Sequence, residues 1–124
     1  MQTRGIRGAI TTTSDNPLEI LSVTKELLQA ILKGNPKLKP EDIASAVFTV
    51  TEDIVSVFPA KAAREIGWEQ VPLICMREIP VPGSLPLCIR TLIHWNTNLS
   101  QDEINHIYLR KARSLRPDLK ESLS

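Results

Sequence analysis

The feature that most constrains the fold is a single long helical pattern near the start of the chain. Asn16 is a residue type that caps helices, Pro17 suits the first helical position, and Glu19 stands where a capping box places its acidic residue. Apolar residues then recur at helical spacing, namely Ile20, Leu21, Val23, Leu27, Leu28, Ile31 and Leu32. Gly34 and Pro36 end this pattern, so the sequence predicts one long amphipathic helix.

Most of the remaining regular structure is predicted to be strand. β-branched residues dominate residues 3–12, where two glycines permit another segment to approach the backbone closely. Residues 43–51 are apolar on both alternating faces, which is typical of a strand that is covered on both sides. Residues 71–78 and 87–97 are two further strands, separated by a loop rich in proline.

Two shorter signals complete the expected elements. Pro59 begins a short helix that Gly67 closes. Ser100 and Glu103 form a second capping box, and the residues after it fit either a strand or a helix. We expect one or two helical turns there, followed by a short strand.

The element count predicts an α+β fold, in which a mixed sheet of four or five strands packs on one long and one short helix. Two such helices cannot cover both faces of this sheet, and another copy of the same chain is the simplest cover. We therefore expect an oligomer. Within each chain we expect one domain over residues 1–117 and a polar, flexible tail over residues 118–124.

Composition excludes several classes of protein. Lys and Arg number 15 and Asp and Glu number 14, and this balance argues against a protein that binds nucleic-acid backbone. Five aromatic residues are too few for a platform that stacks single-stranded nucleic acid. The chain shows neither a signal-peptide core nor an apolar run long enough to cross a membrane, so we expect a cytoplasmic protein.

The cysteines and histidines do not form a recognisable reactive site. Cys88 and His94 share one face of a predicted strand, but the six positions between them span roughly 20 Å, too far for one metal ion. Cys75 and His106 lack the spacing of zinc ligands. The chain also lacks a nucleophile elbow, a glycine-rich phosphate loop and a dinucleotide motif. We expect neither a metal nor a cofactor.

Two arginines inside predicted strands are the unusual feature. Arg90 lies in the middle of an apolar strand, and Arg7 lies between Ile6 and Gly8. A buried guanidinium needs an anionic partner. Composition alone favours a structural explanation, either an ion pair of Arg90 with Glu78 or an edge strand that leaves the arginine in water. The alternative is a ligand carboxylate, which arginine binds with two hydrogen bonds.

A second basic pair lies on the predicted short helix. Lys61 and Arg64 are three positions apart, so they share one side of that helix. Such a pair is usually a solvated face, and it can also form an electropositive entrance that attracts an anion.

Several segments, in order along nearly the whole chain, carry a resemblance to a known family. They are Arg4–Ala9, Val57–Glu65, Val71-Pro72 with Cys75-Met76, Cys88–Arg90, and His106–Leu109 with Leu115–Leu119. Together they resemble the monofunctional, trimeric pseudo-α/β-barrel class of chorismate mutase. The resemblance implies a homotrimer with active sites between subunits and an isomerase of aromatic amino acid biosynthesis. It also implies the reaction, a [3,3] rearrangement of chorismate to prephenate in the shikimate pathway.

A pericyclic reaction suits a chain that is poor in histidine and cysteine. It needs no nucleophile, general base, metal or redox cofactor. It needs a flexible dianion held as a compact chair, and stabilisation of the negative charge that grows on the breaking ether oxygen. Arginines in strands supply both, which favours the ligand role over the structural ion pair.

The resemblance also implies a role for individual residues. Arg90 is expected to donate to the ether oxygen and to a carboxylate, and Arg7 to bind a carboxylate with help from Tyr108. Glu78 is expected to accept the hydrogen bond of the ring hydroxyl, with Cys75 nearby. The remaining expected contacts are Phe58, Ala60 and Leu73 in the pocket wall, and Lys61, Arg64, Leu115 and Arg116 at the entrance or tail. Ile74 stands where the family often has a small polar residue, so only its backbone is expected to bind substrate.

Cys75 and Glu78 differ by three positions, so a regular strand points them to opposite faces. Either a bulge intervenes, or the strand lies at a subunit interface and contributes to sites on both sides. Two other functions remain alternatives: a small-carboxylate-binding or deaminase-like protein on a related trimeric barrel, and a small-anion sensor or assembly domain in which the arginines are structural.

Overall fold

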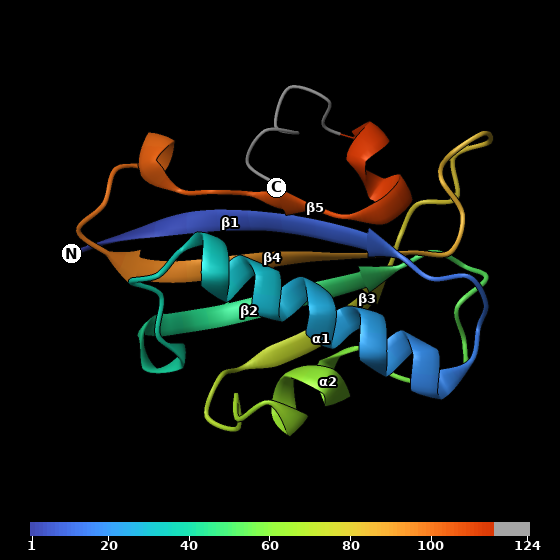
Figure 1. Cartoon of the computed structure of the whole chain (residues 1–124), viewed down its shortest axis with the longest axis horizontal. Coiled ribbons are helices and arrows are strands. Elements are labelled where there is room, and N and C mark those ends of the chain that lie inside the picture. The colour runs from blue at the N-terminus through green and yellow to red at the C-terminus, as the bar shows by residue number, and fades with distance from the viewer. Residues whose placement is uncertain (116–124) are drawn as a thin grey trace.

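A mixed five-stranded sheet organises residues 1–115, the part of the chain that the computed structural model describes (Figure 1). Its order is β3-β2-β4-β1-β5, and β4 runs antiparallel to both of its neighbours. The strands are β1 (Gln2–Thr11), β2 (Ile43–Val50), β3 (Leu73–Arg77), β4 (Cys88–Thr97) and β5 (Ile107–Tyr108). The two edge strands, β3 and β5, pair in parallel with β2 and β1. The predicted α+β class and every predicted strand are confirmed.

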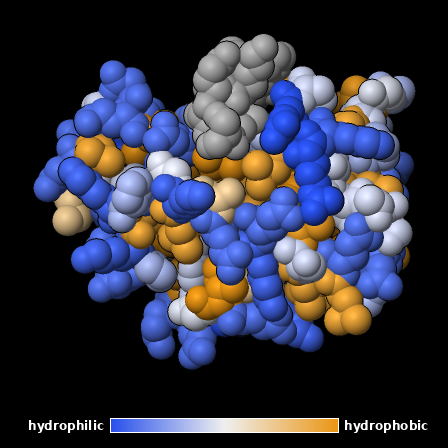
Figure 2. Space-filling model, in the orientation of Figure 1, coloured by the Kyte–Doolittle hydropathy of each residue, from blue (hydrophilic) through white to orange (hydrophobic). Residues whose placement is uncertain are grey.

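Both α-helices of the described residues lie on one side of the sheet (Figure 1). The long helix α1 (Pro17–Gly34) buries seven side chains, and the short helix α2 (Ala60–Glu65) buries three alanines. The main core lies between these helices and the sheet, with Trp68, Trp95 and Phe48 as its largest fully buried side chains. On the surface of the molecule that the helices form, hydrophilic residues surround smaller hydrophobic areas (Figure 2).

The start of α1 differs in one detail from the expected capping box. Asn16 caps the helix as predicted, because its side chain accepts from the backbone N–H groups of Leu18 and Glu19. The Glu19 carboxylate instead turns to the preceding loop, where it accepts from the backbone and hydroxyl of Thr13 at 2.9 and 2.6 Å and from Ser14 at 2.8 Å. The three hydrogen bonds that the Glu19 carboxylate accepts there stabilise it more than the single bond to the backbone N–H of Asn16 that a capping box would provide.

This cluster predicts an acid-sensitive contribution to stability. The hydroxyl of Thr13, its backbone N–H and the hydroxyl of Ser14 lower the pKa of Glu19 from 4.5 to about 2. The wild type should therefore unfold less readily than Glu19→Gln above pH 4.5, and this difference should shrink as the pH falls towards about 2. Urea denaturation across this range measures it, with the exposed Glu69→Gln as control. A difference independent of pH would contradict the assignment.

Gly8 marks a close approach between β1 and α1, which confirms one of the two glycine predictions. A Cβ atom at Gly8 would lie 2.9 Å from the Cδ1 of Ile31 and 3.3 Å from the carbonyl oxygen of Ile107. At Gly5 the nearest atom would be at 3.6 Å, an ordinary contact. Since Gly8 faces α1, its neighbours Arg7 and Ala9 face the opposite side of the sheet, which we call the open face.

The chain after β4 follows the predicted order of turns and strand. A 3-10 turn at Gln101–Glu103 has the expected capping box from Ser100, and β5 follows it. A further 3-10 helix, η3 (Arg110–Leu115), packs against β1 on the open face, where its Ala112 joins a small buried cluster with Ala9 and Tyr108. The expected tail, residues 118–124, lies outside the described residues.

A pair of asparagines holds β5 against the end of α1. Asn35 is 4% exposed, and its Nδ2 donates to the carbonyl oxygens of Ile31 at 3.0 Å and of Asn105 at 2.9 Å. Its Oδ1 accepts from the backbone N–H of Asn105 at 3.0 Å. In turn, Asn105 Nδ2 donates to the carbonyl oxygen of Gly34 at 2.7 Å.

Asn35→Ala is therefore expected to destabilise the fold. The change removes the hydrogen-bond partner of the partly buried backbone N–H and C=O groups of Asn105, and each such bond contributes about 0.5–1.5 kcal/mol. Chemical denaturation measures the loss of unfolding free energy, and the exposed Asn98→Ala is expected to change it by less than about 0.5 kcal/mol. Equal stabilities of Asn35→Ala and the wild type would show that the hydrogen bonds between Asn35 and Asn105 do not stabilise the fold.

Candidate active site

A cavity of about 300 Å³ on the open face brings together four of the residues expected to bind substrate. They are Arg7, Glu78, Arg90 and Tyr108, which come from four different strands or strand ends. The rest of its lining is Gly8, Val47, Thr49, Thr91 and Leu92. Two guanidinium groups and one carboxylate thus meet in a small hollow with largely apolar walls.

The strand register explains why the cavity forms at this place. One row of cross-strand neighbours on the open face runs Arg7, Leu92, Val47 and Ile74. The next row runs Ala9, Arg90, Thr49 and Met76. Glu78 follows Met76 by two positions, and its backbone N–H donates to the carbonyl oxygen of Val50 at 2.9 Å. Glu78 therefore faces the same side as Met76, one row further along the sheet, and its carboxylate reaches back to Thr49 and Arg90 in the second row.

Arg90 and Glu78 form the ion pair that the structural interpretation predicted, but this pair does not satisfy the arginine. The Nε atom of Arg90 lies 3.5 Å from Oε2 of Glu78, and it is buried without any hydrogen bond. Native proteins rarely leave a buried charged donor without an acceptor. The arrangement fits a site whose acceptor belongs to a ligand.

Tyr108 and Arg7 are fixed by the pairing of β5 with β1. The backbone N–H of Arg7 donates to Nδ1 of His106 at 2.9 Å, and Tyr108 lies in register with Ala9. The Tyr108 side chain is 3% exposed and packs in a small cluster with Cys88. Burial of this kind restricts the ring to one orientation, whereas the Arg7 side chain is exposed.

Cys88 lies beside this site and has the chemistry of an inert thiol. Burial raises its pKa, and the nearby positive charge of Arg90 offsets part of that effect. Within residues 1–115, no three His, Cys, Asp or Glu side chains are grouped so that they could hold a metal ion.

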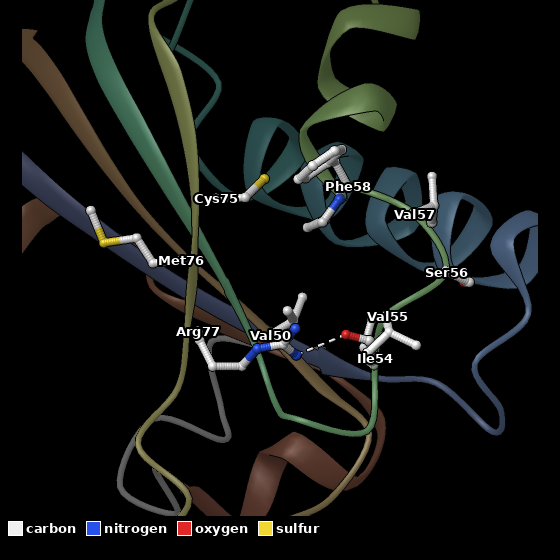
Figure 3. A pocket seen from close by; sticks show the side chains of 10 residues that line it. Val50, Ile54, Val55, Ser56, Val57, Phe58, Cys75, Met76 and Arg77 are labelled. Carbon is white, nitrogen blue, oxygen red and sulfur yellow. Dashed lines mark hydrogen bonds between the residues drawn. The ribbon is translucent and has the colours of Figure 1, made fainter.

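Cys75 and Phe58 line a second cavity, of about 460 Å³, on the other side of β3 (Figure 3). The pairing of Leu73–Arg77 with β2 is regular, so no bulge turns Cys75 towards Glu78. Figure 3 shows Cys75 pointing towards Phe58 and Met76 pointing away from this cavity. Of the two interpretations of the spacing between Cys75 and Glu78, the structure supports a strand that contributes to both sides.

The loop that carries Phe58 is held from two directions. Nη1 of Arg77 donates to the carbonyl oxygens of Thr51 at 2.7 Å and Ile54 at 2.8 Å, the second of which is drawn in Figure 3. The Asp15 carboxylate accepts from the backbone N–H groups of Val55 and Ser56 at 3.1 to 3.2 Å. The Phe58 side chain itself is 70% exposed, which is unusual for an aromatic residue in a chain without partners.

The single chain does not bring the other expected contacts to either cavity. Ala60 is buried in the core, and Lys61 and Arg64 are exposed on α2. Leu73 packs on the main core, Ile74 is 53% exposed on the open face, and Leu115 packs beside Tyr108. Arg116 lies outside the described residues.

Thr49 also belongs to this site and was not predicted; its hydroxyl donates to Oε2 of Glu78. The sequence contains only one indication that Thr49 belongs to the site, namely the alternation that puts residues 47 and 49 on one face of a strand. Its position opposite Arg90 depends on the register between β2 and β4, which a single sequence does not reveal.

Among residues 1–115, no helix is both long enough and apolar enough to cross a lipid bilayer.

Comparison with known proteins gives consistent results. The family model for chorismate mutase type I matches residues 3–119. The chain is 54% identical over 119 residues to the chorismate mutase AroH of Thermus thermophilus, covering 96% of this chain and 98% of that protein. It is 48% identical over 120 residues to the chorismate mutase AroH of Bacillus subtilis, covering 96% and 94%. A solved chorismate mutase structure from Clostridium thermocellum superposes with a TM-score of 0.86 at 44% identity, covering 89% of this chain and 97% of that one.

Proposed function

This chain belongs to the chorismate mutase type I family, and from that premise we propose that its open-face cavity is where chorismate rearranges to prephenate. The observation that carries the proposal is that Arg90 lines the cavity while its buried Nε has no hydrogen-bond acceptor. Chorismate is a dianion with an ether oxygen, so it offers acceptors of the kind that the cavity lacks.

Arg90 is the residue to which we assign most of the rate enhancement. As the C–O bond of the ether breaks, negative charge grows on its oxygen, and a fixed guanidinium stabilises that charge more than it stabilises the substrate. The same group has donors enough to hold one carboxylate in place. Because Arg90 lies in a central strand, its backbone needs no rearrangement at the moment of reaction.

The other groups restrict the conformation of the substrate. Arg7 binds a carboxylate from the next row of the open face, and Tyr108 supports it with a hydroxyl on a buried ring. Glu78 accepts the hydrogen bond of the ring hydroxyl. Contacts at separate points of one flexible molecule favour the compact chair over its extended conformers.

We propose that the complete site forms between subunits of a homotrimer. The open face carries Ile74 at 53%, Met76 at 49% and Leu92 at 39% exposure, and no helix of residues 1–115 covers them. A second copy that packs there buries these side chains and brings its own Phe58 to the open-face cavity. This arrangement accounts for Phe58 and Cys75, which face away from the cavity of their own chain.

The basic pair on α2 then lies at the entrance of a neighbour's site. Lys61 and Arg64 are exposed, on the helix that follows Phe58. In this position they attract the dianion, and Leu73, Ile74 and Ala60 support the wall through packing or backbone groups. Leu115 packs beside Tyr108, and we assign to Arg116 a contact at the entrance or tail of the site.

We further propose a single domain over residues 1–117 and a cytoplasmic location. The family model spans almost the same range, residues 3–119. Both cysteines are free thiols, as is usual in reducing compartments.

The assignment of the activity is tested by incubating the purified protein with chorismate. The loss of chorismate absorbance and the appearance of prephenate are followed together. Equal rates of loss and formation are expected. Binding of chorismate without conversion at micromolar protein would instead favour the small-carboxylate-binding alternative.

A further inference from the structure

We propose that Thr49 is a positioning residue that sets which oxygen of Glu78 faces the substrate. The inference rests on the proposed function, since it assumes that Glu78 accepts the hydrogen bond of the ring hydroxyl. It adds a residue to which neither the sequence analysis nor the comparisons assign a role.

The position of Glu78 shows why its side chain needs support. The residue comes directly after β3, an edge strand, so no further strand of residues 1–115 lies beside it. Its side chain is 25% exposed. Few neighbouring groups therefore restrict rotation about the side-chain bonds of Glu78.

Thr49 provides that support from the adjacent strand. Its hydroxyl donates to Oε2 of Glu78, and the two residues line the same cavity. Thr49 lies in register with Arg90 on its other side, and Oε2 is also the oxygen that lies 3.5 Å from the Arg90 Nε. Both of the interactions that orient the carboxylate thus act on one oxygen.

The other oxygen, Oε1, is left to accept from a ligand. A carboxylate oxygen has two lone pairs, and no hydrogen bond or ion pair within residues 1–115 uses Oε1 of Glu78. Because threonine is β-branched, its own hydroxyl has few rotamers, so the direction of the bond to Oε2 is well defined. Glu78 then presents Oε1 in one direction, which selects substrates that carry a hydroxyl there.

The test compares two substitutions that differ in the hydroxyl. Thr49→Val keeps the branched shape and removes the donor, whereas Thr49→Ser keeps the donor. Thr3→Val is the matched control, because that hydroxyl donates to Asn96 at 2.7 Å on another part of the sheet. For each variant, kcat/KM is measured with chorismate and with the analogue in which hydrogen replaces the ring hydroxyl.

The expected result is a change in the preference between the two substrates. In Thr49→Val, the ratio of kcat/KM for chorismate to that for the analogue should fall about tenfold or more, the range of a hydrogen bond to a charged group. Thr49→Ser and Thr3→Val should keep the ratio of the wild type. A general folding defect lowers both values of kcat/KM and leaves the ratio unchanged, so an unchanged ratio in Thr49→Val overturns the inference.

Glu78→Ala separates this inference from the proposed function on which it rests, because it removes both carboxylate oxygens that could accept from the ring hydroxyl. If Glu78→Ala lowers the ratio and Thr49→Val does not, Glu78 acts as assigned and Thr49 does not position it. If Glu78→Ala keeps the ratio of the wild type, the assigned role of Glu78 itself is wrong.

Discussion

Arg90→Ala is expected to abolish turnover of chorismate while the proposed homotrimer stays intact. The substitution removes a guanidinium that lines the cavity, and with it the charge that we assign to the breaking ether oxygen. Loss of one preorganised donor to a developing oxyanion lowers kcat by about 10²–10³, and a full guanidinium charge should lie at the upper end or beyond.

The fold should tolerate this change, because the Arg90 side chain is 35% exposed and its one ion partner lies at 3.5 Å. Arg90→Lys should recover only part of the rate, since an ammonium group lacks the planar set of donors. Arg4→Ala is the matched control, because Arg4 is also a strand arginine and its Nε donates to the carbonyl oxygen of Leu99 at 2.9 Å, outside the cavity. Steady-state kinetics measures the turnover of each variant, and analytical ultracentrifugation measures its oligomeric state. Near-normal turnover, or dissociation of the trimer, would contradict the assigned role.

Met76→Asp is expected to prevent assembly of the proposed homotrimer, leaving monomers, and to remove activity with it. Met76 is 49% exposed in the apolar part of the open face, next to Thr49. Burying an unpaired carboxylate in an interface costs several kcal/mol, enough to prevent association at micromolar concentration. Turnover should fall by about 10³ or more, because the two parts of each site then lie on separate molecules.

The monomer should keep its secondary structure, since the main core lies on the other side of the sheet. Leu18→Asp is the matched control, because Leu18 is 78% exposed on α1 and faces away from the sheet. Circular dichroism and ultracentrifugation distinguish dissociation from unfolding. An active monomer, or a trimer that forms despite the new carboxylate, would show that the open face is not the interface.

Local signals were sufficient to predict the elements of the fold. The ends of α1 were predictable from Asn16, Pro17 and Gly34, because capping and helix termination depend on residues adjacent in sequence. The strands were found through alternation and β-branched residues for the same reason. The redirection of Glu19 to Thr13 was not predictable, because it depends on how the preceding loop folds back over the helix.

The candidate site was predictable in composition but not in geometry. The spacing of Cys75 and Glu78 correctly indicated two faces, since alternation along a regular strand is a local property. The neighbours of Arg90 depend on strand order and register, which are long-range properties of the sheet. For that reason Thr49 was missed, and the sequence could not show that Arg7, Arg90 and Glu78 share one cavity while Phe58 faces another.

Mixing subunits of two variants tests most directly whether the active site is shared. Arg90→Ala removes the part of the site on the open face, and Phe58→Asp places a charge that repels the dianion in the part that we assign to the neighbour. Each variant alone should be inactive. After joint unfolding and refolding in equal amounts, about a quarter of all sites should hold both native parts, because each part is native with a probability of about one half, so turnover should return to about a quarter of the wild type. No recovery, or an active Phe58→Asp protein before mixing, would contradict a site built from two subunits.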